Sequence, residues 1–324
     1  MAQSLQPPVT PGIRKAPRLQ YGDTIGVVAP AGPVPAEALE EGLARLRSWG
    51  YRTAVGHAVL NRRGYLAGND AERAADFHRM WANPQVKGII CARGGYGAMR
   101  ILERLDWELI ARTPKFFCGF SDITALHVAM ERKAGLVTFH GPMTAAMGSA
   151  VTYNTAGQQT AMQATEPLGA VPWPEPGEGA PVPQAIRPGV AEGRLAGGNL
   201  SLLAALMGTP WEPDFAGRIV LLEDVDEAPY RVDRMLMHLL LAGKLQQAAG
   251  IVFGDSPSCM KGPEGKPSLT LAEVLEDHLG GLGIPVLYGF PCGHTGYRAT
   301  IPLGVQARLD AGAGALTVLE GALV

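Results

Sequence analysis

The sequence has few charged residues and almost equal numbers of each sign. Lys and Arg total 28 and Asp and Glu total 30 among 324 residues, which gives a formal net charge of −2. Proteins that bind nucleic acid through its phosphates usually carry a basic patch and a positive charge. The composition therefore argues against a nucleic-acid partner.

Long apolar runs and paired cysteines are also missing. No run of about 18 apolar residues occurs, and the start of the chain (MAQSLQPPVTPGIRKAPRL) has no apolar signal-peptide core. The four cysteines, Cys91, Cys118, Cys259 and Cys292, are scattered, and no pair has metal-ligand spacing. No H-E-x-x-H motif occurs. We therefore expect a soluble cytoplasmic protein with reduced thiols, no membrane partner, no metal and no other cofactor.

Apolar residues are abundant enough for a sizeable core, at 47% of the chain. The length favours two domains. Seven prolines lie between residues 167 and 188, a composition that resists regular structure and is typical of a linker or an extended excursion. We therefore predict an amino-terminal tail (1–20), a first domain (21–160), a proline-rich linker (161–193) and a second domain (194–324).

Strand and helix signals alternate through the first domain. Apolar runs at 24–29, 86–91 and 116–119 predict buried strands. Leu39, Leu43 and Leu46 recur at helical spacing, and Asn69 has the features of a helix N-cap. Such alternation predicts a Rossmann-like, mostly parallel sheet with helices on both faces.

The second domain shows a different pattern. Strands are predicted at 218–222, 250–253 and 285–288, with helices beginning at Pro229 and spanning 271–278. Two further strands joined by Ala-Gly-Ala-Gly, at 305–310 and 315–320, predict a hairpin. We therefore expect a smaller α/β carboxy-terminal domain with a mixed sheet.

The run Phe-Phe-Cys-Gly-Phe-Ser-Asp-Ile-Thr-Ala-Leu-His (116–127) carries the most chemical information in the chain. An apolar strand stops at Gly119, and Ser121 begins a helix. A serine on a sharp strand-to-helix turn presents its hydroxyl at the end of the sheet, as a nucleophile requires. The alternative is that Ser121 only caps the helix, a position where serine is common.

A serine nucleophile needs a base. His294 lies in a glycine-flanked loop after the strand at 285–288. Functional residues are common in loops at the carboxyl ends of strands. His140 ends another strand, where it either faces the cleft or is simply hydrogen-bonded. His127 lies six residues beyond Ser121 on a different face of the same helix, out of reach. His294 is therefore the predicted base.

The orienting acid and the oxyanion hole are predicted from strand ends. Glu223 directly follows the apolar strand at 218–222 and points where strand ends form sites. Asp224, Asp226 and Glu227 follow within four residues, and Glu227 is the competing carboxylate. We expect some of these three acids to cap the helix at Pro229. The backbone N–H groups of Asp122 and Gly95 are the predicted oxyanion donors. Gly95 lies in a glycine-rich turn that fits no nucleotide-binding spacing.

With these residues assembled, the chain resembles the LD-carboxypeptidases, serine peptidases that include microcin C self-immunity peptidases. The motifs that carry the resemblance occur in the family's order: Gly-Asp-Thr-Ile-Gly-Val-Val-Ala-Pro-Ala-Gly-Pro (22–33), Ala-Arg-Gly-Gly-Tyr-Gly (92–97), Gly-Phe-Ser-Asp-Ile-Thr-Ala-Leu (119–126), His-Gly-Pro (140–142), Gly-Gly-Asn-Leu (197–200), Gly-Thr-Pro (208–210), Leu-Glu-Asp-Val-Asp-Glu-Ala-Pro-Tyr-Arg-Val-Asp-Arg-Met-Leu (222–236) and Gly-His with Ile-Pro-Leu-Gly (293–304). They cover nearly everything except the tail and the proline-rich stretch.

The resemblance implies a Ser121–His294–Glu223 triad between two domains, and a homodimer. The implied reaction is hydrolysis of the amide between an L-centre and a terminal D-amino acid, chiefly D-Ala of murein tetrapeptides in cell-wall recycling. Phe120 stands where the family often has tyrosine, and the proline-rich stretch is a second departure.

The residues that would contact the substrate are less well defined by these motifs. Those predicted to do so are Gly94, Tyr96, His140 and Arg298; Arg93 and Arg231 are the other candidates for binding its terminal carboxylate. Two alternatives to the murein activity stay open: a microcin-type hydrolase of peptidyl or aminoacyl adenylates, and a non-catalytic protein that binds a muropeptide or a nucleotide.

Overall fold

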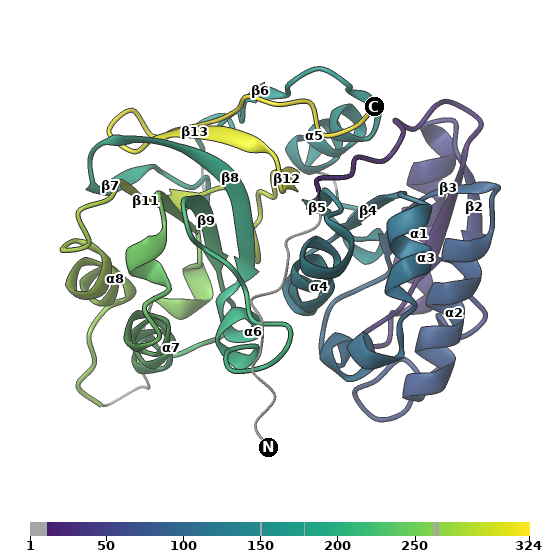
Figure 1. Ribbon diagram of the computed structural model, residues 1–324, viewed down its shortest axis with the longest axis horizontal. Helices are drawn as coiled ribbons and strands as arrows, with labels where there is room; N and C mark the ends of the chain where they lie inside the picture. Colours follow the sequence, from purple (N-terminus) through teal and green to yellow (C-terminus); the bar gives the residue numbers. More distant parts are fainter. Residues whose placement is uncertain (1–11, 150, 178, 261, 263–265) are drawn as a thin grey trace.

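The computed structural model describes residues 12–149, 151–177, 179–260, 262 and 266–324. The chain forms two β-sheets side by side, with helices packed around them (Figure 1). The first eleven residues of the expected amino-terminal tail lie outside the described residues. In the part of the chain that is described, no helix has both the length and the apolar character needed to cross a membrane.

The first sheet has six strands. In spatial order they are β12 (Ile301–Leu303), β5 (Thr138–His140), β4 (Phe116–Gly119), β3 (Val86–Cys91), β1 (Thr24–Val28) and β2 (Arg52–Val55). All neighbours pair in parallel except β12, which runs antiparallel to β5.

The helices of this half follow the strands in alternation. They are α1 (Ala36–Ser48), α2 (Asp70–Ala82), η1 (Ala98–Arg104), α3 (Trp107–Arg112), η2 (Ser121–Ile123), α4 (Thr124–Ala134), η3 (Thr144–Ala146) and α5 (Thr152–Gln163). Asn69 caps α2 as predicted, in a capping box with Glu72.

The strand order indicates where a site would lie, at the carboxyl ends of the strands of this sheet. Read from β2 to β5, the order is that of a doubly wound fold, in which the connections reverse direction between β1 and β3. In such folds ligands bind beyond the carboxyl ends of the strands at this reversal. The turn after β3 and the turn after β4, which holds Ser121, both lie at the carboxyl ends of these strands.

The second sheet has eight strands. In spatial order they are β6 (Gly169–Ala170), β14 (Ala315–Val318), β13 (Gln306–Asp310), β8 (Val190–Asn199), β9 (Arg218–Glu223), β10 (Gly250–Gly254), β11 (Val286–Phe290) and β7 (Gln184–Arg187). The four strands β8 to β11 are parallel and the outer ones antiparallel. The predicted hairpin of β13 and β14 and the predicted mixed α/β fold are confirmed.

Helices cover one face of this sheet. They are α6 (Leu200–Ala205), α7 (Pro229–Leu241), η4 (Leu245–Gln247), η5 (Pro257–Cys259) and α8 (Leu271–Leu279). The predicted helix starts at Pro229 and Leu271 are both present.

The two halves are joined more closely than a linker between domains suggests. β12 comes from the carboxy-terminal half yet completes the first sheet, and the proline-rich stretch contributes the short edge strands β6 and β7 to the second. Edge strands are where prolines are tolerated in a sheet. Two apolar cores also run across both halves: one includes Phe77 and Leu236, and the other Leu43 and Leu309.

Polar contacts cross the same boundary. Arg218 of β9 forms an ion pair with Glu131 of α4, and the Asn199 N–H donates to Thr124 Oγ1 at 2.9 Å. Groups from the two halves are therefore held at fixed positions relative to one another.

Candidate active site

Ser121 sits in a strained turn between β4 and η2. Its φ of 64° lies in the left-handed region, which side-chain-bearing residues rarely occupy and which costs about 1–3 kcal/mol. Ser121 caps neither η2 nor α4, since neither helix has a side-chain cap. Its Oγ instead lies 3.1 Å from His294 Nε2. The helix-cap interpretation is therefore wrong, and the strain orients the hydroxyl toward the histidine.

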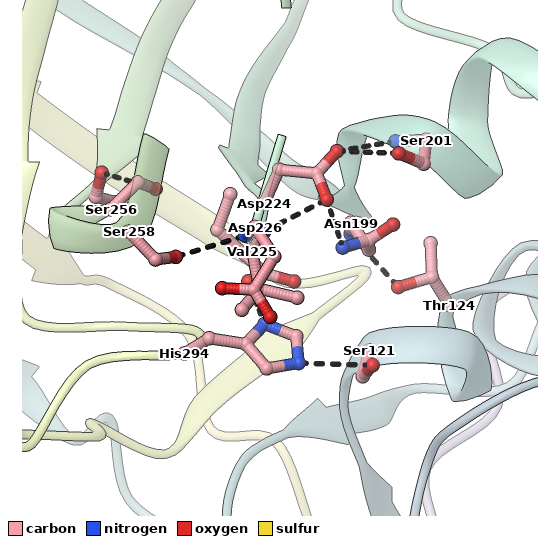
Figure 2. Close-up of polar contacts among 12 residues, drawn as sticks. Ser121, Thr124, Asn199, Ser201, Asp224, Val225, Asp226, Ser256, Ser258 and His294 are labelled. Atoms are coloured by element: carbon pink, nitrogen blue, oxygen red, sulfur yellow. Dashed lines mark hydrogen bonds and ion pairs between the residues drawn. The ribbon is translucent and has the colours of Figure 1, made fainter. Parts of the chain in front are cut away.

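His294 lies in the loop after β11 and contacts both halves. Its Nδ1 is 2.7 Å from Glu223 Oε2, and its ring packs 4.9 Å from the ring of Phe120. Figure 2 shows the imidazole between the strand end of the second half and Ser121. With Nδ1–H donating to the carboxylate, Nε2 is left as the acceptor for the Ser121 hydroxyl.

Glu223 is the last residue of β9 and is fully buried. Burial by itself raises the pKa of this carboxyl, but the hydrogen bond and charge interaction with His294 hold the pKa below its ordinary value. Glu227 lies elsewhere, in an ion pair of 3.4 Å with the half-exposed Arg231. Of the two candidate carboxylates, only Glu223 contacts His294.

Asp224 and Asn199 form a second polar network beside Glu223. Asp224 accepts from Asn199 Nδ2 at 3.1 Å and from Ser201 N and Oγ at 2.9 and 2.7 Å (Figure 2). The prediction that acids of this cluster cap the Pro229 helix is wrong, because α7 begins without a side-chain cap and Asp224 supports α6 instead. Sequence reasoning assigned Asn199 no role. The sequence feature that could have identified Asn199 is its position as a helix N-cap directly after Gly-Gly.

The glycine-rich turn (residues 93–97) lies against Ser121. A Cβ on Gly94 would come within 2.8 Å of Ser121 Cβ, so only glycine allows this approach. The N–H groups of Gly95 and Asp122 have no backbone acceptor among the residues that the structure describes. Backbone N–H groups without an acceptor can donate to an oxyanion that forms nearby.

The other two buried histidines of this region do not touch Ser121. His127 is hydrogen-bonded to Thr138 Oγ1 and to the Gly119 carbonyl, both at 2.9 Å. His140 is 1% exposed and packs 5.8 Å from the Phe120 ring. Among the described residues, neither of its ring nitrogens has a partner.

Burial of these two histidines predicts a pH effect on stability. It lowers the pKa of His140 to about 4 and of His127 to about 3. The unfolded chain binds a proton at each near pH 6.5, whereas the folded chain does not, so this part of the stability is present above pH 6.5 and is lost as the pH falls. In His140→Phe we expect the free energy of unfolding to fall less steeply between pH 6 and 4.5, by up to about 1.4 kcal/mol per pH unit.

Urea unfolding at several pH values between 6 and 4.5 measures how steeply the free energy of unfolding changes with pH. Burial raises the pKa of Asp122 and of Asp224 to about 6, which opposes the histidines, but both carboxyls are present in both proteins and cancel in the comparison. The control is His57→Phe at an exposed position, where the wild-type slope should be retained. Equal slopes for His140→Phe and the wild type would contradict the expectation.

Arg298 is a cation without a carboxylate partner in the described part of the chain. Its guanidinium lies 5.9 Å from the centre of the Phe120 ring, within cation–π range, and burial lowers its pKa. Arg93 donates to the Pro33 carbonyl at the surface, and Arg231 pairs with Glu227. Tyr96 is half exposed and packs edge-on against Tyr65.

No three His, Cys, Asp or Glu side chains gather as metal ligands would within the described ranges.

These observations define the class of the protein. It is a two-sheet α/β protein in which a strained serine, a histidine and a buried glutamate from different strand ends form one hydrogen-bonded line. Such a line can pass a proton from the serine to the histidine while the carboxylate holds the imidazole in place.

The chain belongs to the LD-carboxypeptidase family. Residues 25–141 match the LD-carboxypeptidase N-terminal domain and residues 192–309 the C-terminal domain. A "Probable murein peptide carboxypeptidase" of Bacillus subtilis is 42% identical, with 91% of each chain covered.

Solved structures of two related proteins share the fold. A muramoyltetrapeptide carboxypeptidase from Oxalobacter formigenes has 33% identity and a TM-score of 0.77, covering 93% of this chain and 99% of that one. The microcin C7 self-immunity protein MccF, in complex with glutamyl sulfamoyl guanosine, has 27% identity and a TM-score of 0.88, covering 96% and 99%. The family and its named members support a carboxypeptidase.

Proposed function

We propose that the protein is a serine carboxypeptidase that hydrolyses the L,D amide bond of murein tetrapeptides and releases terminal D-alanine in cell-wall recycling. The observation that carries this proposal is the line from Ser121 Oγ through His294 to Glu223, with distances of 3.1 and 2.7 Å, in a member of a carboxypeptidase family. The homodimer implied by the resemblance stays a prediction.

In the first step Ser121 Oγ attacks the carbonyl carbon of the amide and its proton passes to His294 Nε2. Glu223 stabilises the imidazolium through its bond to Nδ1. The C–N bond then breaks as the Nε2 proton moves to the departing amine, which leaves as D-alanine. A water molecule, deprotonated by the same nitrogen, hydrolyses the acyl-enzyme and restores the serine.

The backbone N–H groups of Asp122 and Gly95 would hold the tetrahedral oxyanion. Asp122 follows Ser121 in the chain, and Gly95 follows Gly94, which lies against Ser121; neither N–H has a backbone acceptor among the described residues. Removing one such donor typically costs about 10²- to 10³-fold in kcat.

Arg298 is the best placed of the three arginines to bind the terminal carboxylate, because it stacks on Phe120 beside His294 and has no carboxylate partner among the described residues. We expect Arg298→Gln to raise KM for the tetrapeptide by about 10- to 100-fold, since a charge-assisted hydrogen bond contributes about 1.5–3 kcal/mol.

The steady-state kinetics of that variant should be compared with those of Arg231→Gln, for which we expect a KM close to the wild type. A peptide with an amidated carboxyl terminus should be a poor substrate for the wild type and should not distinguish it from Arg298→Gln. An unchanged KM in Arg298→Gln would exclude this arginine as the carboxylate anchor.

The activity itself is tested by mass spectrometry of a murein tetrapeptide after incubation with the protein. The expected product has lost one alanine residue, and free D-alanine appears in equal amount. An intact tetrapeptide after prolonged incubation would contradict the proposal.

The second candidate function is hydrolysis of aminoacyl or peptidyl adenylates. It is favoured by the likeness to MccF, whose structures include complexes with glutamyl sulfamoyl guanosine and aspartyl sulfamoyl adenosine. Incubation of aspartyl sulfamoyl adenosine beside the tetrapeptide separates the two. Cleavage of the sulfamoyl compound alone would favour the second candidate.

A further inference from the structure

The glycine-rich turn must stay at a fixed distance from Ser121 if Gly95 is to bind an oxyanion. Turns of this composition are flexible unless tied down, because glycine has the most conformational freedom to lose. Two buried charged side chains, Asp122 and Arg73, contact the end of this turn.

The side chain of Asp122 ties the turn to the serine. It is 1% exposed, and its Oδ2 accepts from the Ala98 N–H, directly after the turn, at 2.7 Å. Asp122 also follows Ser121 in the chain. A single residue therefore links the serine, its own backbone N–H and the end of the turn that carries Gly95.

Arg73 of α2 contacts the same end of the turn. Its buried guanidinium donates to the carbonyl of Gly97 at 2.8 Å and to that of Pro30. A Cβ on Gly97 would come within 2.8 Å of Arg73 Nη1, so glycine is needed for this approach. Arg73 is fixed in turn by Asp70 at 2.5 Å, which Arg100 also contacts.

A third contact orients the Gly95 donor. The Gly32 N–H donates to the Gly94 carbonyl at 2.9 Å. In a trans peptide the carbonyl and the following N–H point in opposite directions, so the Gly95 N–H points away from Gly32. Rotation of the Gly94–Gly95 peptide would turn this N–H in another direction. The bonds of Asp122 and Arg73 hold the following end of the turn, at Ala98 and Gly97.

Keeping a carboxylate in this place is costly. Burial raises the pKa of Asp122 to about 6, although the hydrogen bond from the Ala98 N–H and the charge of the nearby Arg73 oppose the rise. A buried carboxylate costs folding free energy, and Asp122 forms no ion pair among the described residues, since Arg73 pairs with Asp70. A positional role would account for it.

We propose that Asp122, together with Arg73, is a positioning residue that fixes the oxyanion-binding turn against Ser121. The inference rests on the proposed function, in which Gly95 is an oxyanion donor. The Asp122 carboxylate touches no reacting atom in this role and acts through the Ala98 N–H.

The kinetic test compares Asp122→Ala and Asp122→Asn with Asp106→Ala. Asp106 makes the same kind of bond, to the Leu109 N–H at 2.9 Å, at the exposed start of α3. We expect Asp122→Ala to lower kcat for the tetrapeptide about 100-fold with little change in KM, as misplacement by about 1 Å does. Asp122→Asn keeps an acceptor for Ala98 and should recover much of that loss. Asp106→Ala should lose stability only.

Wild-type kcat in folded Asp122→Ala would overturn the proposal, and so would an equal loss in Asp122→Asn and Asp122→Ala. If Asp122→Ala does not fold, Asp122→Leu, which fills a similar volume without an acceptor for the Ala98 N–H, takes its place. Wild-type kcat in folded Asp122→Leu would then overturn the proposal.

Amide hydrogen exchange of residues 94–98 gives a readout that does not need the reaction. Exchange should be faster in Asp122→Ala than in the wild type and unchanged in Asp106→Ala. If the wild type does not cleave the tetrapeptide, the proposed function fails while this measurement still reports on the anchoring. Unchanged exchange in Asp122→Ala would overturn the anchoring itself.

Discussion

Replacing Ser121 with alanine is expected to lower kcat for release of D-alanine by about 10⁴- to 10⁶-fold, as the loss of the nucleophile does in other serine triads. The substitution removes the only atom that can form the acyl-enzyme in the proposed mechanism. It leaves the two oxyanion donors and the Arg298 anchor in place, so peptide binding should change little. Quantitative mass spectrometry of the tetrapeptide gives kcat, and calorimetry gives the dissociation constant.

A second inactive variant separates loss of chemistry from loss of folding. Ser121 has a φ of 64°, and alanine retains the strain of that conformation whereas glycine relieves it. Ser121→Gly should therefore be as inactive as Ser121→Ala and at least as stable. Undiminished release of D-alanine by either variant would remove Ser121 as the nucleophile and favour a non-catalytic binding protein or another mechanism.

Local signals in the sequence predicted most of the elements. The apolar runs that became β1, β3 and β4, the Asn69 cap and the helix starts at Pro229 and Leu271 all depend on residues close together in the chain. Helix caps and strand periodicity are short-range effects, so a sequence pattern can reveal them.

Pairings between distant segments were not predictable in the same way. β12 completes the first sheet by pairing with β5, about 160 residues earlier in the chain, and the proline-rich stretch supplies two edge strands. Each is stabilised by contacts that exist only after the rest of the sheet has formed. A short apolar run such as that of β12 carries no information about which strand it will join.

The same limit applies to the site. Ser121, Glu223 and His294 could be proposed because each sits at the end of a predicted strand or in a glycine-flanked loop. The polar side chains that support these three residues could not be proposed from the sequence. Asn199, Asp224 and Arg73 act through bonds to groups 23 or more residues away, such as the Gly97 carbonyl for Arg73. Some of the acids after Glu223 were therefore expected to cap the nearest helix in sequence, whereas Asp224, one of them, supports α6.

The choice between Glu223 and Glu227 leads to the second large expected effect. Glu223→Gln should lower kcat by about 10²- to 10⁴-fold, because an amide can donate to His294 Nδ1 and so favour the tautomer that cannot accept the Ser121 proton. Glu227→Gln is the matched control at the half-exposed ion pair with Arg231, and we expect its kcat to stay near the wild-type value.

The structural reason for this asymmetry is burial. Glu223 has no access to solvent, and its bond of 2.7 Å to His294 is the interaction that keeps its pKa low despite burial. A neutral amide at that position no longer stabilises the imidazolium that forms when Ser121 attacks, and no water can substitute for the lost charge. Glu223→Asp, which keeps the charge but shortens the side chain, should retain more activity than Glu223→Gln. Near-normal turnover in Glu223→Gln together with a large loss in Glu227→Gln would assign the orienting role to Glu227 and require the loop after β9 to rearrange when substrate binds.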